Sequence, residues 1–214
     1  MARRIMIVGN GEIPQGMADF IDLSDMVIRF NDCRSVGPGG RRTDIVAVCN
    51  TGRPGKAMAE GDDWRRLEAV RQASAIWSVR DPAKFAEMEP DILEKWPELD
   101  DFCADYSAGF AAIADQTGKD HVVIPRAIHE QMDAALQAYS PEPYVCPSSG
   151  MIAIAHVLEE NGTAGDNLAL AGFGHEGWSG HPFAAERQLV DALINQGRLT
   201  RISNLSIFSA SQGA

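Results

Sequence analysis

The segment GFGHEGWSGHPFAAE, residues 172–186, holds the side chains best suited to moving a proton. A histidine with its ordinary pKa of about 6.5 can accept a proton at neutral pH, which makes His181 a candidate general base. Pro182 suits the first position of a helix, so His181 should lie just outside that helix. Glu186, one turn inside it, could then orient or polarise the imidazole. The alternative is that His181 is an ordinary residue beside a helix cap.

A turn that could hold a phosphate follows the first apolar run, in the stretch IMIVGNGEIPQG. Gly9 and Gly11 would let the backbone approach a ligand closely. Between them, the carboxamide of Asn10 can donate a hydrogen bond to an anionic oxygen without adding charge. The alternative is that Asn10 is a turn residue that tolerates a left-handed backbone.

Ser148, Ser149 and Gly150 stand at the start of a long apolar segment, GMIAIAHVLEENG. Serine is a preferred N-cap, which accounts for one of the two hydroxyls. The N-terminus of a helix is also an anion site, because its first backbone N–H groups have no partner within the helix. The two roles are compatible, so both are expected here.

The opening turn also resembles the dinucleotide-binding fingerprint, because Asp32 follows a second apolar run where that pattern has an acidic residue for a ribose. The fingerprint requires a third glycine three residues after Gly11. That position is Pro14, and the next glycine is Gly16. A nicotinamide-dependent oxidoreductase would need a site at this turn with Asp32 on the ribose, and the broken pattern argues against it.

Short apolar runs alternate with helix-length segments along the chain, which predicts an α/β fold with a mainly parallel sheet. The runs are rich in Val and Ile, as buried parallel strands are. Strands are predicted at 5–8, 26–30, 44–49, 74–79, 121–124, 168–173 and 205–208. Helices are predicted at 62–73, 126–139, 150–162 and 186–197, and the last two end at glycines.

Residues 81–118 hold helical segments without an obvious strand, and we interpret them as a helical insertion. No stretch rich in Pro, Gly or Ser marks a domain boundary, so residues 1–214 are predicted to form a single α/β domain. A chain of this length can bury about 70% of the surface that its unfolded form exposes.

The net charge of −11 makes the chain a poor partner for nucleic acid or an anionic membrane. No apolar stretch is long enough to span a membrane and no signal peptide precedes the first strand, so we expect a cytoplasmic protein. Four cysteines lack the spacing of a zinc site and are predicted to be buried free thiols: Cys33, Cys49, Cys103 and Cys146.

Three segments, in order, resemble the sialylmotifs of the sialyltransferases of glycosyltransferase family 29. The large motif of that family begins VGN-(S/G)-G and continues to V-x-R-x-N and G-x-(R/K)-T, which are matched by Gly9-Asn10-Gly11, residues 27–31 and residues 40–43. The small motif begins P-(S/T)-(S/T)-G, as residues 147–150 do, and closes in G-F at Gly172-Phe173. The very small motif, H-x4-E, matches His181 and Glu186.

The resemblance implies a Rossmann-like glycosyltransferase fold and inverting transfer of a CMP-activated acidic sugar, of the sialic-acid type, without a metal or cofactor. It makes His181 the base with Glu186 as its support, and it places Asn10 and Asn31 on the phosphate and ribose of the donor. A further family histidine, proposed to meet the departing phosphate, would correspond to His175. The implied substrate-binding set is Gly9, Asn10, Gly11, Asn31, Ser148, Ser149, Gly150, Gly172, Phe173 and His175.

The sequence also departs from the family. Ile5 stands where the family has one cysteine of a disulfide, and the second half of the small motif has no cysteine. The segment between the small and very small motifs is much shorter than in the family, and so is the chain as a whole, which removes much of what binds the acceptor. Some short bacterial proteins of this kind are labelled accessory proteins of urease operons. The alternative function is therefore a non-catalytic nucleotide-binding or accessory protein that keeps the donor cleft.

The remaining histidines and several arginines are more ambiguous. His121, His129 and His156 fall in predicted strand or helix faces and are expected to be structural. Arg29, Arg41, Arg42 and Arg53 could line an anion pocket, although solvated surface arginines are the commoner case. The acceptor and the oligomeric state are left open.

Overall fold

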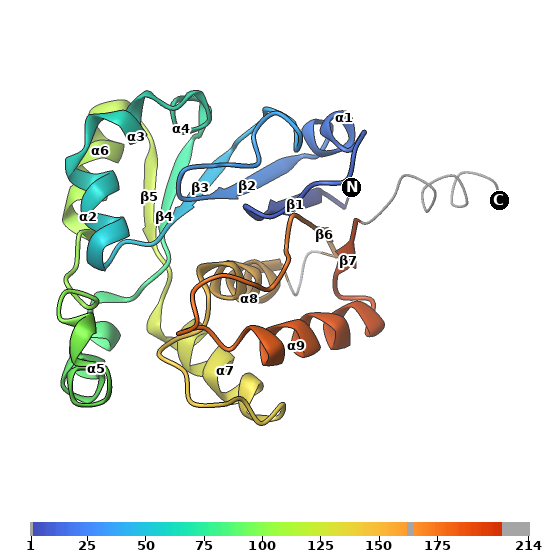
Figure 1. Cartoon of the computed structure of the whole chain (residues 1–214). Helices are drawn as coiled ribbons and strands as arrows, with labels where there is room; N and C mark the ends of the chain where they lie inside the picture. The colour runs from blue at the N-terminus through green and yellow to red at the C-terminus, as the bar shows by residue number, and fades with distance from the viewer. Residues whose placement is uncertain (1, 162–164, 203–214) are drawn as a thin grey trace.

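One parallel sheet organises the molecule (Figure 1). The computed structural model describes residues 2–161 and 165–202, and in these the sheet has seven strands in the order β5-β4-β3-β2-β1-β6-β7. The α/β class with a parallel sheet is thereby confirmed. The strands are β1 Arg4–Val8, β2 Met26–Phe30, β3 Ile45–Val48, β4 Ala75–Ser78, β5 Asp120–Val123, β6 Asn167–Ala171 and β7 Thr200–Arg201.

The apolar runs place the first six strands within two residues of their observed bounds, because all of these strands except the edge strand β5 are buried on both faces over most of their length. The predicted strand at 205–208 lies outside the described residues. The sheet instead continues at β7, a two-residue strand that the sequence pattern does not indicate. Val8 pairs with Arg29 of β2 on one side and with Ala171 of β6 on the other, so these three strands end side by side.

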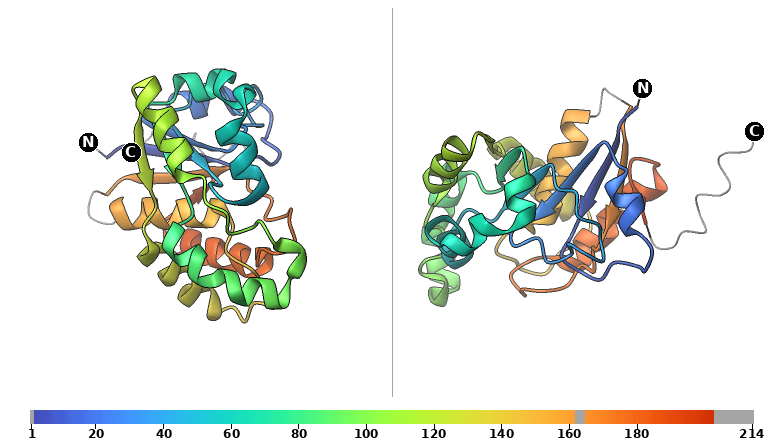
Figure 2. Two further views of the ribbon diagram at one scale, coloured as in Figure 1. Left: turned by 90° about the vertical axis from the view of Figure 1, so that its left-hand side faces the viewer. Right: turned by 90° about the horizontal axis from the view of Figure 1, so that it is seen from above.

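Helices cover both faces of the sheet (Figures 1 and 2). The helices α7, α8 and α9 pack on one face, whereas α1 to α4 and α6 pack on the other. Helix α5 and the 3-10 helix η1 contribute to a separate apolar cluster with Phe102 and Cys146. The bounds are α1 Ala18–Asp22, α2 Gly52–Glu60, α3 Asp62–Arg66, α4 Glu68–Gln72, α5 Pro82–Lys95, η1 Pro97–Leu99, α6 Ser107–Thr117, α7 Arg126–Gln137, α8 Ser149–Asn161 and α9 Phe183–Asn195.

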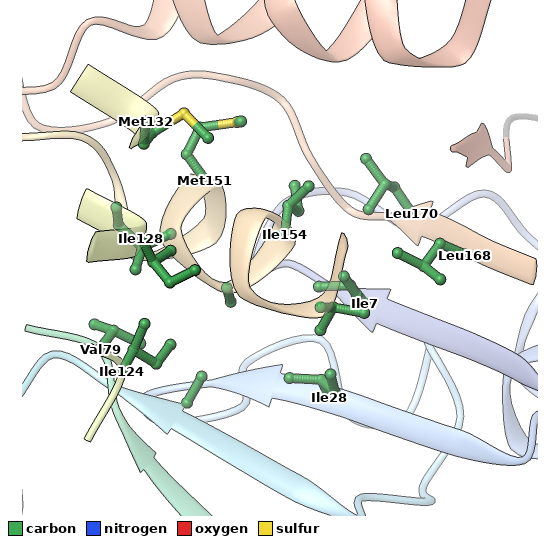
Figure 3. Close-up of a cluster of buried hydrophobic side chains, with 14 of the residues drawn as sticks. Ile7, Ile28, Val79, Ile124, Ile128, Met132, Met151, Ile154, Leu168 and Leu170 are labelled. Atoms are coloured by element: carbon green, nitrogen blue, oxygen red, sulfur yellow. The ribbon is translucent and has the colours of Figure 1, made fainter. Parts of the chain in front are cut away.

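Helix α8 is the centre of the larger core cluster (Figure 3). Met151 and Ile154 are at most 1% exposed and lie among apolar side chains of the sheet and of α7. This burial follows from the sequence, in which the first turns of α8 are apolar on every side. The deep packing fixes the N-terminus of α8, with its two serines, at the carboxyl edge of the sheet.

The predicted helix at 62–73 is instead two short helices, α3 and α4, separated at Leu67. Leu67 has an extended ψ of 130° and is one of the exposed large apolar side chains. The break has a physical reason: Trp64 is held by a hydrogen bond from its indole Nε1 to the Asn31 carbonyl, at 2.8 Å. The turn at Leu67 then lets Val70 reach the same buried cluster as Trp64.

Three further expectations from the sequence concern the cysteines, membrane-spanning helices and three of the histidines. All four cysteines are free and buried, which confirms their prediction. Among the described residues, no helix has the length and apolar character needed to cross a bilayer. His129 and His156 are also buried, and His121 Nε2 lies 2.9 Å from Ser78 Oγ, as structural histidines would be.

Candidate active site

A cleft lies at the carboxyl ends of β1 and β6, where the chain leaves β1 toward β2 and leaves β6 toward β7. In parallel sheets, ligands bind at such a switch point, because the two departing connections open a crevice between them. The cleft has a volume of about 490 Å³. It is lined by all of the residues for which the sequence predicts a catalytic or binding role, namely Gly9, Asn10, Gly11, Asn31, Ser148, Ser149, Gly150, Gly172, Phe173, His175, His181 and Glu186.

Glycines let the ends of β1 and β6 approach each other. The Gly9 N–H donates to the Ala171 carbonyl at 2.8 Å, and the Gly11 N–H donates to the Gly172 carbonyl at 2.9 Å. A Cβ atom on Gly9 would lie 2.4 Å from the Gly172 oxygen, and one on Gly11 would lie 2.7 Å from it. The close approach at this turn is to the loop after β6, and the predicted approach of this backbone to a ligand stays a prediction.

Asn10 fastens the two loops that border the cleft. Its Nδ2 donates to the Phe30 carbonyl at 3.1 Å, and its Oδ1 accepts from the Arg34 N–H at 3.0 Å. The left-handed backbone suggested as an alternative for Asn10 occurs instead at Asn31, where φ is 51°. Asn10 is thus mainly a brace between the loops after β1 and β2.

Asn31 is better placed than Asn10 to bind a ligand. Its Oδ1 accepts from the Cys49 N–H at 2.8 Å, which fixes the orientation of the carboxamide. In the part of the chain that the structure describes, no acceptor contacts its Nδ2, and the residue lines the cleft. Two oriented N–H donors are therefore available to an anionic or hydroxyl oxygen.

Ser148 and Ser149 have different roles in the structure, whereas the sequence does not show which of them caps the helix and which is free to bind an anion. Ser148 is the N-cap of α8, because its Oγ accepts from the Met151 N–H at 3.2 Å. Ser149 lines the cleft. Within residues 2–161 and 165–202, three donors at this point have no acceptor: the Ser149 hydroxyl, the Ser149 N–H and the Gly150 N–H. A Cβ on Gly150 would lie 2.6 Å from the Phe173 ring, so glycine is required for Phe173 to pack there. The start of α8 therefore offers free donors to an anion.

The expectation that Glu186 orients the His181 imidazole needs correction. Its Oε1 accepts from the Ser148 N–H at 2.6 Å, and its Oε2 accepts from the Ser148 hydroxyl at 2.8 Å. The carboxyl is 1% exposed, and this burial raises its pKa, although the two bonds from Ser148 oppose the rise. Glu186 binds the start of α8 because two donors and the positive end of the helix dipole converge there.

His181 lies outside α9, as predicted, and its tautomer follows from its partner. Its Nδ1 lies 2.8 Å from the Cys146 carbonyl oxygen. A carbonyl can only accept, so we assign the proton to Nδ1, which leaves Nε2 as an unprotonated acceptor. Burial lowers the pKa of His181 to about 4, with the nearby Arg80 charge lowering it further and the Cys146 bond opposing both. At neutral pH the imidazole is therefore uncharged and able to accept a proton at Nε2.

His175 has a different environment from His181. Its backbone φ is 51°, and its Nε2 lies 3.2 Å from an Nη of Arg201, which can only donate. Burial and the charges of Arg201 and Arg187 lower the pKa of His175 to about 4. A phosphate contact from His175 would therefore have to come from Nδ1.

Of the arginines that were candidates for an anion pocket, three have other partners, and one, Arg53, lines a second cavity that is described below. Arg29 is fully buried and donates to loop oxygens, including the Gly39 carbonyl at 2.7 Å. Arg42 pairs with Asp44, and the Arg41 N–H donates to Asp22. Arg53 is exposed and pairs with Asp101 at 2.9 Å.

A second cavity, of about 410 Å³, adjoins the cleft, and sequence reasoning missed most of its lining. The two share Asn31, Ser149, Trp178 and His181. Arg80 and Phe102 belong to the second cavity alone. The available signal for Arg80 was its position just after an apolar run, where the carboxyl end of a parallel strand brings a residue to the ligand edge of the sheet.

The dinucleotide fingerprint is not built at the opening turn. Gly11 opens no helix; the chain continues as a loop until α1 begins at Ala18. The backbone donors that a pyrophosphate meets in that fold are therefore not arranged here. Asp32 pairs with Arg34 at 3.2 Å and does not line the cleft.

A comparison with curated proteins decides the family. The chain is 53% identical over 212 residues to the urease operon 23 kDa accessory protein of Rhizobium meliloti (strain 1021), which covers 99% of this chain and 98% of the relative. The chain belongs to the family of this accessory protein. No model of a protein family matches the sequence.

Solved structures similar to this chain include sialyltransferases. A mammalian sialyltransferase aligns with a TM-score of 0.55 at 17% identity, over 94% of this chain and 69% of that one. The sialyltransferase CstII from Campylobacter jejuni, in complex with cytidine-5′-monophosphate, aligns with a TM-score of 0.50 at 14% identity, over 96% and 83% of the two chains. At these identities the likeness shows a shared fold: this chain has the sialyltransferase architecture.

Proposed function

We propose that the chain is an inverting glycosyltransferase, similar to those of glycosyltransferase family 29, that transfers a CMP-activated acidic sugar of the sialic-acid type to an acceptor hydroxyl. One observation carries the proposal: His181, with its unprotonated Nε2, lines the same cleft as Asn10 and Ser149. A histidine that faced solvent or the core would not support catalysis.

The cleft offers two kinds of donor to a nucleotide sugar. The free N–H groups and hydroxyl at the start of α8 suit the phosphate, because oriented N–H groups and the helix dipole both favour negative charge. The Cys49 N–H donates to the Asn31 Oδ1 and so orients the carboxamide, whose Nδ2 can reach a ribose or phosphate oxygen on the other side of the same cleft. The shared fold with a sialyltransferase solved with cytidine-5′-monophosphate agrees with this ligand class.

In the proposed reaction these groups account for the proton transferred and for the bonds that form and break, and the proposal uses no metal ion. The acceptor oxygen attacks the anomeric carbon of the sugar, and its proton passes to Nε2 of His181. The bond between the anomeric carbon and the phosphate oxygen breaks, and CMP leaves with that electron pair. The new bond forms on the face opposite the departing CMP, so the configuration inverts. Nδ1 keeps its proton throughout, held by the Cys146 carbonyl, which also stabilises the imidazolium that forms.

A second candidate function is a nucleotide-binding accessory protein that has lost transfer. The name of the 53% identical relative favours it, since that protein is called a urease operon accessory protein. The chain also covers only 69% of the mammalian sialyltransferase structure. A shorter chain has fewer residues with which to bind an acceptor, and this also favours the accessory function. The two functions share the nucleotide cleft and differ in whether His181 performs proton transfer.

The expected result that tests the nucleotide site is selective binding of CMP that depends on Asn31. Asn31→Asp keeps the Oδ1 that accepts from Cys49 but replaces the Nδ2 donor by a charged oxygen facing an anionic ligand. A lost hydrogen bond to a charged group is worth about 1.5–3 kcal/mol, so the dissociation constant should rise by roughly 10- to 150-fold. Isothermal titration with CMP, and with UMP, AMP and NAD as comparators, measures both the selectivity and the loss.

Asp32→Asn is the matched control, because it replaces a carboxylate by an amide at the residue that follows Asn31 and does not line the cleft. It should leave CMP affinity unaltered. If Asp32→Asn reduced binding and NAD bound better than CMP, a dinucleotide site would replace the proposed one. Equal CMP binding by wild type and Asn31→Asp would remove Asn31 from the donor site.

A further inference from the structure

Arg80 is a buried cation that faces the second cavity. It lies two residues after the end of β4, is 6% exposed, and lines the cavity together with Thr51 and Phe102. The guanidinium carbon lies 4.4 Å from the centre of the Phe102 ring and 5.1 Å from that of Phe85. Contacts with aromatic faces stabilise a desolvated arginine and fix its plane, but they leave its edge of N–H donors available.

Arg80 shares the second cavity with two carboxylates, Glu98 and Asp101, but forms no ion pair with either. Across residues 2–161 and 165–202, no carboxylate lies within 4.0 Å of its guanidinium; its side-chain partners are the Thr51 hydroxyl and, at 3.8 Å, the weakly accepting sulfur of Cys146. Arg53, at the same cavity, pairs with Asp101. A desolvated charge without a counter-charge is costly, which is why buried arginines are normally paired. An anion entering the cavity would supply the missing partner.

The Thr51 hydroxyl also links Arg80 to the start of α2. Thr51 is the N-cap position of α2, but it makes no side-chain cap, and the third helical residue, Pro54, has no N–H to receive one. The first N–H of the helix, that of Gly52, already donates to the Ala104 carbonyl at 2.9 Å. An anion beside Arg80 would therefore meet the guanidinium and the Thr51 hydroxyl, and a planar guanidinium matches the geometry of a carboxylate.

The position of the cavity relates this charge to the reacting atoms. His181, Ser149 and Asn31 belong to both the donor cleft and the second cavity, so a group in the second cavity lies next to the proposed reaction centre. Trp178, another shared residue, packs its ring 5.4 Å from Phe102 and gives the cavity an apolar wall suited to the face of a sugar.

We propose that Arg80, with Thr51, is a subsite for the carboxylate of an acidic sugar bound beside His181. The inference rests on the proposed function and goes beyond it, because it assigns a charged specificity contact to a residue outside the three sequence motifs. Two sources share this chemistry: the carboxylate on the transferred sugar of the donor, and a carboxylate on the acceptor.

The test compares acids with their neutral esters. In the donor arm, the protein is titrated with CMP-N-acetylneuraminate and with its carboxylate methyl ester; in the acceptor arm, CMP-saturated protein is titrated with glucuronate and with methyl glucuronate ester. We expect wild type to bind the acid about 10- to 150-fold more tightly than the ester in one of the two arms, which identifies the source. Arg80→Met should abolish that preference while the affinity for CMP alone stays unchanged.

The controls separate charge from folding. Arg53→Met removes a paired arginine from the same cavity and should leave the acid preference intact. The acid-to-ester comparison on wild type needs no variant, so the absence of a preference refutes the subsite even if Arg80→Met does not fold. No preference in either arm, with CMP bound normally, would overturn the Arg80 subsite alone. Failure of CMP itself to bind would refute the proposed function and this inference with it.

Discussion

Replacing His181 by alanine should slow sugar transfer by about 10²- to 10⁴-fold, the usual contribution of a positioned general base. The affinity for CMP should stay nearly unchanged, because the proposed donors to the nucleotide are Asn31 and the start of α8. Release of CMP from CMP-N-acetylneuraminate, followed at saturating donor, measures the first quantity, and titration with CMP measures the second. His121→Asn, which alters a histidine on β5 away from the cleft, is the control for a general effect of histidine removal.

The pH profile distinguishes a base from a binding residue at position 181. A base works unprotonated, and burial lowers the pKa of His181 to about 4, so the free enzyme keeps the active form from neutral pH down to about pH 5. The acid limb of kcat/KM should therefore lie near pH 4 rather than near the ordinary 6.5. The limb of kcat should lie higher, because an anionic donor in the cleft favours the charged imidazole. Loss of CMP binding together with activity in His181→Ala would indicate a structural role instead.

Replacing Arg29 by methionine should lower the free energy of unfolding by about 3–5 kcal/mol. Arg29 is fully buried on β2 and donates to four oxygens of the loop that follows: the carbonyls of Arg42 and Gly39 and the hydroxyls of Thr43 and Ser35. An apolar side chain of similar length would leave these acceptors buried without partners, at a cost of about 1–3 kcal/mol each for those that stay dry. Urea denaturation followed by circular dichroism measures the change.

Arg34→Met is the matched control for Arg29→Met. Arg34 is an exposed arginine of the same loop whose side chain pairs with the exposed Asp32, and its replacement should change stability by less than about 0.5 kcal/mol. A stable Arg29→Met variant that had lost only CMP binding would contradict this account. It would mean that Arg29, which the motif resemblance places beside Asn31, serves the ligand rather than the loop.

The strands and the main buried helix could be predicted from local pattern alone. β1 to β4 are mostly apolar, with Arg29 as the one charged residue inside a strand, and the first turns of α8 are apolar on every side. Consecutive apolar residues predict burial on both faces of the sheet. The grouping of the site residues was also predictable, because residues that follow parallel strands meet at one edge of the sheet. Gly9, Asn31 and Gly172 lie there for this reason.

Contacts between distant side chains could not be predicted in the same way. Nothing near Glu186 in the sequence indicates that its carboxylate will bind Ser148, 38 residues earlier, rather than His181. The break at Leu67 likewise depends on a hydrogen bond from Trp64 to Asn31, which lies 33 residues away. Arg80 carried no motif at all; its role emerges only when folding places it over Phe102 without a carboxylate partner.

The crystal structure of the protein with CMP tests the central claim most directly, since the claim is that one cleft between β1 and β6 holds the donor beside His181. We predict the phosphate within hydrogen-bond distance, about 3 Å, of the Ser149 hydroxyl or the N–H groups at the start of α8, with the Asn31 Nδ2 bound to the nucleotide. The phosphate should point toward the cavity shared with His181. CMP bound elsewhere on the molecule, or in the cleft with its phosphate directed away from His181, would contradict the account.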